Sequence, residues 1–84
     1  MEMAELKAAW NLVLDDLEQN DRVAWLTFFD ARLATLIDNE LKLDFADPEK
    51  FSGGHDFQPA REKFLPLLKN AIKKITGNDL EVSW

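Results

Sequence analysis

The chain contains no cysteine, and this absence excludes several kinds of chemistry at once. Without thiols there is no disulfide framework, no thiolate zinc site and no cysteine nucleophile. We therefore expect a cytoplasmic protein whose fold is held together by its hydrophobic core. Histidine is nearly absent as well, since His55 is the only one. Any metal site would therefore have to depend on carboxylates.

The sequence also has no recognisable targeting segment and has fewer basic than acidic residues. The first ten residues contain no basic segment followed by an apolar run, and no stretch approaches 18 uninterrupted apolar residues. We therefore expect neither a secretory signal nor a membrane partner. Ten basic residues against sixteen acidic ones give a net charge of −6, which disfavours duplex nucleic acid as a ligand. The expected partner is another protein with a basic patch, or a second copy of the chain in a homodimer.

No motif for catalysis or for cofactor binding can be written through the sequence. Gly53 and Gly54 belong to neither a P-loop nor a dinucleotide fingerprint, and no zinc or calcium motif is present. His55 could act as a proton donor beside Asp56, but no nucleophile accompanies it. We expect a chain with no catalytic residues, no metal and no cofactor.

Large apolar side chains are abundant by contrast. The 84 residues are 46% hydrophobic and include three Trp and six Phe. A chain of this length forms one domain, and each buried aromatic side chain removes roughly 150–250 Å² from water. Residues 1–84 are therefore expected to fold as a single interaction domain.

The first half of the chain predicts two helices. Apolar residues recur at helical spacing from Leu6 to Leu17, which predicts a helix over residues 4–19. Asn20 and Asp21 interrupt this pattern and can cap a second helix that contains Val23, Trp25, Leu26, Phe28 and Phe29. This second segment is crowded with apolar residues. Either it is a central helix covered on most sides, or one of its aromatic residues is left for a partner.

A β-hairpin is predicted over residues 31–46, where the apolar period shortens to two. Leu33, Thr35 and Ile37 alternate before an Asp38-Asn39 turn, and a second alternating set follows at Leu41, Leu43 and Phe45. An extension of the second helix as far as Leu36 is the competing interpretation.

The second half of the chain predicts a helix and a closing strand. Residues 47–50 favour a single helical turn that delivers Phe51 to the core, and residues 52–56 form a glycine-containing loop. A long helix is expected to start near Pro59 or Ala60, with a kink or a later start because of Pro66, and to stop at Gly77. Residues 80–84 alternate once more and predict a strand beside the hairpin. The fold class is α+β, in the order α-α-β-β-α-β.

This order, with the segments AWNLVLDDL, IDNELKLDFADPEKF and REKFLPLLKNAIKKITGNDLEVSW, resembles a replication module. It is similar to domain III of the DnaX clamp-loader subunits of bacterial DNA polymerase III, and more distantly to domain I of the initiator DnaA. The resemblance implies a compact fold related to the K-homology domain, with a three-stranded sheet packed against helices. It also implies contact with a helicase or a replication regulator, self-association, and in some members weak single-strand binding.

Two sets of residues are candidates for contacts. The partner-binding candidates are aromatic residues of the first two helices ringed by acids, namely Trp10, Trp25 and Phe28 with Asp15 and Asp16. For Trp10 and Trp25, packing in the core is the alternative. The nucleic-acid candidates are the basic residues of the third helix, namely Arg61, Lys63, Lys69, Lys73 and Lys74. A solvated face that compensates the helix dipole is the alternative for these.

Overall fold

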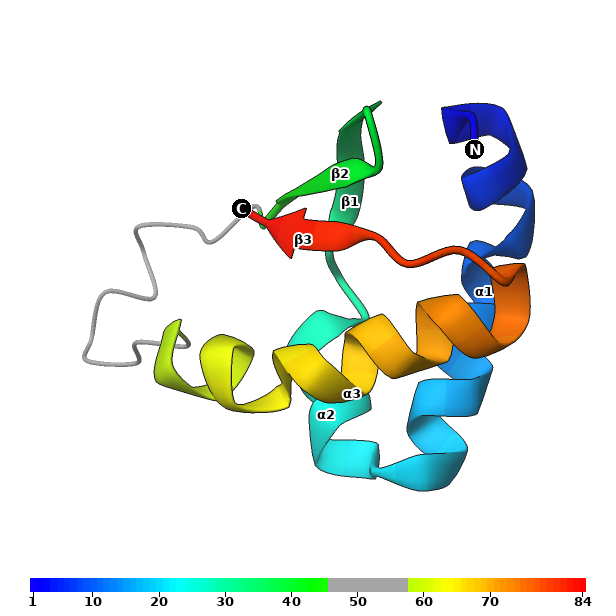
Figure 1. Cartoon of the computed structure of the whole chain (residues 1–84). Coiled ribbons are helices and arrows are strands. Elements are labelled where there is room, and N and C mark those ends of the chain that lie inside the picture. The colour runs from blue at the N-terminus through cyan, green and yellow to red at the C-terminus, as the bar shows by residue number, and fades with distance from the viewer. Residues whose placement is uncertain (46–57) are drawn as a thin grey trace.

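The helices and strands occur in the predicted order, and the fold is α+β (Figure 1). The computed structural model describes residues 1–45 and 58–84, so the expectations for residues 47–51 and 52–56 lie outside the described residues. The elements within the described ranges are α1 (Met3–Asn20), α2 (Arg22–Phe28), β1 (Arg32–Ile37), β2 (Glu40–Asp44), α3 (Gln58–Thr76) and β3 (Glu81–Ser83).

The three described strands form one mixed sheet with β2 at its centre. Strand β1 pairs with β2 in antiparallel orientation through the hairpin, and β3 pairs with β2 in parallel orientation on the other side. A parallel neighbour needs a crossover connection, and the chain between β2 and β3 contains α3. The predicted closing strand beside the hairpin is therefore confirmed.

A β-bulge in β1 changes which of its side chains face the core. Leu33 is paired with Leu43, but the next pair joins Thr35 to Lys42, so Ala34 is left out of the register. Leu33 and Leu36 consequently pack against the core, whereas Ile37 is 64% exposed. The predicted alternation of Leu33, Thr35 and Ile37 is therefore wrong, as is the extension of the second helix to Leu36.

The helices cover the sheet and enclose the core. In Figure 1, α3 crosses in front of α1 and α2, and it contacts both of them. The predicted stripe of α1 is confirmed, because its buried side chains are those of Leu6, Trp10, Val13 and Leu17. The other buried apolar residues of the described ranges come from α2, β2, α3, β3 and the residues that precede β1 and β3, namely Ala24, Phe28, Ala31, Leu41, Leu43, Leu68, Ala71, Ile72, Leu80 and Val82.

Helix α3 contains Pro66 in its interior and ends where the sequence predicts. The helix begins at Gln58, so a start delayed by Pro66 is wrong. Pro66 itself is exposed. Gly77 has a positive φ of 77° and donates its backbone N–H to the carbonyl oxygen of Lys73 at 2.7 Å. This left-handed residue closes the helix, as expected for glycine at this position.

An aromatic cluster joins α2 to the sheet. The ring of Phe28 lies 6.1 Å from that of Phe45 and 6.3 Å from that of Trp84, and the Phe45 and Trp84 rings meet edge to face at 5.9 Å. These centroid distances fall in the range of favourable aromatic pairs. The cluster fixes the inner face of α2 against the end of β2 and the last residue of the chain.

The turn of the hairpin yields a stability prediction. Asp38 and Asn39 have φ values of 52° and 64°, and the Asn39 carbonyl oxygen accepts the backbone N–H of Glu81 at 2.8 Å. Since β-branched residues resist positive φ, Asn39→Val should lower the free energy of unfolding by about 1–2 kcal/mol in urea titrations. Asn39→Gly should change it by less than about 0.5 kcal/mol. Equal losses for both variants would contradict this account.

Candidate interaction surface

A single residue, Asp21, creates the corner between α1 and α2. Its backbone N–H donates to the carbonyl oxygen of Leu17 at 2.8 Å and so ends α1. Its carboxylate Oδ1 accepts the backbone N–H groups of Val23 at 2.9 Å and Ala24 at 3.2 Å, and so begins α2. The predicted cap is confirmed for Asp21, whereas Asn20 is the last residue of α1 and its side chain donates to Asp16. Because no residue separates the cap of one helix from that of the other, α2 must leave α1 at a sharp angle.

The corner at Asp21 and the core beneath it together orient α2. Ala24 and Phe28 are fully buried. The opposite side carries Val23, Leu26 and Phe29, which are 57%, 51% and 49% exposed. These three positions are spaced by three residues and fall on one face of the helix, which continues in helical geometry to Phe29 at φ −62° and ψ −28°. We call Val23, Leu26 and Phe29 the α2 strip.

One residue of the α2 strip, Phe29, packs against the half-buried side chain of Trp25. The rings of Trp25 and Phe29 stack with their centroids 5.1 Å apart and an interplanar angle of 28°. Trp25 also packs against the core. The stacking holds Phe29 in place while much of its surface remains in water. Trp25 is therefore the one predicted aromatic candidate that lies beside an exposed apolar surface.

Two other predicted partner-binding residues lie in the core. Trp10 is 8% exposed and Phe28 is completely buried, so neither can present a ring to a partner. Each points inward because its helix turns the apolar stripe toward the sheet and α3. The prediction that these two aromatic residues anchor a partner is therefore wrong, and packing in the core is confirmed for Trp10.

The two predicted acids of α1 have different environments. Asp15 is exposed and makes no ion pair within the described ranges. The Asp16 side chain is only 12% exposed, and its Oδ1 lies 2.7 Å from Nζ of Lys74 on α3. Asn20 also donates to Asp16 Oδ2 at 3.2 Å. Asp16 thus holds two helices together, and only Asp15 is available to a partner.

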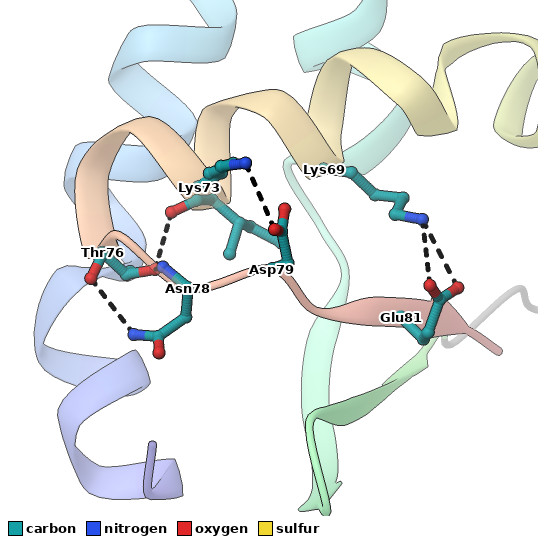
Figure 2. A network of polar contacts seen from close by, with 7 residues as sticks. Lys69, Lys73, Thr76, Asn78, Asp79 and Glu81 are labelled. Atoms are coloured by element: carbon teal, nitrogen blue, oxygen red, sulfur yellow. Dashed lines mark hydrogen bonds and ion pairs between the residues drawn. The ribbon is translucent and has the colours of Figure 1, made fainter.

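The lysines of α3 are paired with carboxylates rather than free for phosphate. Figure 2 shows Lys73 directed at Asp79 and Lys69 directed at Glu81, with Nζ to carboxylate distances of 3.2 Å and 3.4 Å. Lys74 completes the series through Asp16. The three lysines are therefore locally neutralised, which weakens the case for a phosphate-binding face.

The remaining basic candidates also have intramolecular contacts. Arg61 is 7% exposed, and its guanidinium carbon lies 3.7 Å from the centroid of the Phe45 ring, a cation–π contact. Lys63 is exposed, with its ammonium 5.4 Å from the ring of Phe64. The prediction of Arg61 as an exposed nucleic-acid contact is therefore wrong, because this side chain supports the aromatic cluster.

Reasoning from the sequence did not select the residues that form the exposed surface. In the sequence, Val23, Leu26 and Phe29 are recognisable only as apolar residues of the second helix. The available signal was the crowding of apolar residues around a short helix, which one core cannot cover on every side. Leu12 and Ile37 are also exposed, at 57% and 64%, but on other elements.

Other kinds of site find no support in the part of the chain that the structure describes. There, no group of three or more His, Cys, Asp or Glu residues is arranged to hold a metal ion. Across the same residues, no helix has the length and apolarity needed to cross a membrane. His55 lies outside the described residues.

Comparison with known proteins identifies no related protein. No family model matches the chain, and neither a curated protein nor a solved structure matches it significantly.

The cap at Asp21 predicts a measurable loss of stability. Replacing Asp21 with Ala leaves the first backbone N–H groups of α2 without their acceptor, and we expect the free energy of unfolding to fall by about 1 kcal/mol. Glu18→Ala removes a nearby exposed carboxylate and should change it by less than about 0.5 kcal/mol. Urea denaturation followed by circular dichroism measures both. A loss for Glu18→Ala as large as that for Asp21→Ala would refute the role of the cap.

The neighbouring acids of α1 offer a second matched pair. Asp16→Asn and Asp15→Asn each remove one negative charge from the same turn of the helix, but only the first breaks the ion pair with Lys74. We expect Asp16→Asn to be less stable than Asp15→Asn by about 0.5–1 kcal/mol at low salt. The difference should shrink as salt rises. Indistinguishable unfolding curves would show that the ion pair contributes nothing.

Proposed function

We propose that the chain is a non-enzymatic protein–protein interaction module and that the α2 strip is its docking surface. The observation that carries this proposal is the contiguous exposure of Val23, Leu26 and Phe29 on one face of a helix. Exposed apolar residues scattered singly are ordinary, whereas a contiguous set of large ones marks an interaction site. Leu12 and Ile37 belong to the first kind.

The physical properties of the strip suit a docking surface. Burying apolar area yields roughly 25 cal/mol per Å², so a few large side chains can anchor a partner. Phe29 is already held by its stacking on Trp25, so little side-chain freedom is lost when a partner covers it. Asp21 fixes the helix itself from the other end.

The kind of partner follows from the surroundings of the strip. Exposed acids lie on the neighbouring part of α1 at Asp15 and Glu18, and the whole chain is acidic. A partner that presents at least one basic residue beside an apolar centre would be attracted by these acids. The resemblance to clamp-loader and initiator modules further predicts a partner from the replication machinery, such as a helicase or a regulator, and this stays a prediction.

Site-specific cross-linking tests the proposal. A photoreactive amino acid is placed at position 26 in the α2 strip and, as a matched control, at position 12, because Leu12 is about equally exposed on α1. After irradiation in an extract of the source cells, we expect discrete adducts from position 26 and few from position 12. A protein recovered from position 26 is then purified, and its affinity for the chain is measured by calorimetry.

The calorimetric step decides between outcomes. Leu26→Glu should weaken binding of the purified partner by at least about tenfold, because it places a charge in the centre of the contact, whereas Leu12→Glu should leave the affinity unchanged. Adducts in equal yield from both positions, or equal affinities for both variants, would contradict the assignment of the docking surface.

A further inference from the structure

The charges at the two ends of the α2 strip point to a specific occupant. We infer that the strip binds the same strip of a second copy of the chain, with the two α2 helices antiparallel across a two-fold axis at Leu26. This inference rests on the proposed function, because it names the partner of the same surface.

The positions along α2 match such a two-fold axis. In an antiparallel pair centred on Leu26, each residue faces the one that lies equally far on the other side of position 26. Val23 then faces the second copy's Phe29, and Leu26 faces its own counterpart. Arg22 lies four residues before Leu26, about 6 Å along the helix axis, and Asp30 lies four residues after Leu26, two residues beyond the end of α2. Arg22 therefore meets Asp30 of the second copy at both ends of the contact.

Charge complementarity supports this arrangement over other occupants. Arg22 is the only charged residue within α2, Asp30 follows the helix directly, and both are exposed. Neither forms an ion pair within the described ranges of its own chain. Two acidic chains repel each other over most of their surfaces, since each carries a net charge of −6. The three residues of the α2 strip are uncharged and are flanked by one charge of each sign, so two copies can meet there with less repulsion than elsewhere.

The charges of Arg22 and Asp30 interact unfavourably with the dipole of α2. A helix dipole favours acidic residues at the N-terminus and basic residues at the C-terminus. Apart from the acidic cap Asp21, helix α2 has the reverse, with Arg22 in its first turn and Asp30 beyond its last turn; the first turn contains no acid and the last turn no base. Charges that oppose local stability are expected where they serve a contact. An antiparallel second copy places an opposite charge beside each of them.

The predicted association is weak, because each copy contributes only three apolar side chains to the contact. One pair of oppositely charged residues, Arg22 and Asp30, lies at each end. Interfaces of this small size belong to transient complexes, so we expect dimers at concentrations of about 100 µM and above. Sedimentation velocity from about 10 µM to about 1 mM covers this range. Leu26→Glu should abolish the association, and Leu12→Glu should leave it intact.

A charge swap tests the register directly. Arg22→Glu and Asp30→Lys each bring like charges together at both ends of the pair, so each variant alone should self-associate at least about tenfold more weakly than the unmodified chain. An equimolar mixture of the two restores opposite charges at both ends and should associate about as tightly as the unmodified chain. Both substitutions improve the match to the helix dipole, so the fold should be retained, as circular dichroism can verify.

The outcomes separate this inference from the proposed function. A chain that stays monomeric to about 1 mM, or a mixture that associates no better than its components, overturns the dimer. In either case, adducts with another protein from position 26 leave the docking surface standing. Absence of any adduct at position 26, in extract and with the purified chain alone, would overturn both.

Discussion

The hydrogen bonds of Asp21 are the constraint on which the rest of the surface depends. Its backbone N–H donates to the carbonyl oxygen of Leu17 at the end of α1, and its carboxylate oxygen accepts the backbone N–H groups of Val23 and Ala24 at the start of α2. With no spacer between the two helices, their relative orientation is set by this residue and by the core beneath it. Phe28 packs inward against the aromatic cluster, and the α2 strip on the opposite side of the helix therefore faces outward.

The fold therefore produces its exposed apolar surface through its own packing. Phe28 must lie against Phe45 and Trp84 to complete the core, and a helix of seven residues cannot bury both of its faces on one small domain. The lysines of α3, by contrast, are engaged in contacts within the fold. Lys69, Lys73 and Lys74 form ion pairs with carboxylates of β3, of the loop before β3 and of α1. These lysines therefore connect elements of the fold, whereas the α2 strip makes no such connection and stays exposed.

Local patterns in the sequence predicted the elements well. The stripe of α1, the cap at Asp21, the turn at Asp38 and Asn39 and the stop at Gly77 each depend on neighbouring residues only. The bulge at Ala34 could not be predicted, because it arises from pairing with β2, and it is what leaves Ile37 in water.

The candidate site was less predictable, for a related reason. Which face of α2 lies outward depends on α3 and on the aromatic cluster, which are distant in sequence. The same holds for Asp16, whose partner Lys74 is 58 residues away. Aromatic residue type therefore suggested Trp10 and Phe28 as anchors, although tertiary packing buries both.

The most direct test of the account is a methyl NMR spectrum of the chain recorded over a concentration series. Val23 and Leu26 in the α2 strip and Leu12 and Ile37 outside it are all more than half exposed, so exposure alone does not distinguish them. The account predicts that the methyl signals of Val23 and Leu26 shift as the concentration rises, while those of Leu12 and Ile37 stay fixed. Shifts confined to Leu12 or Ile37, with the α2 strip unchanged, would contradict it.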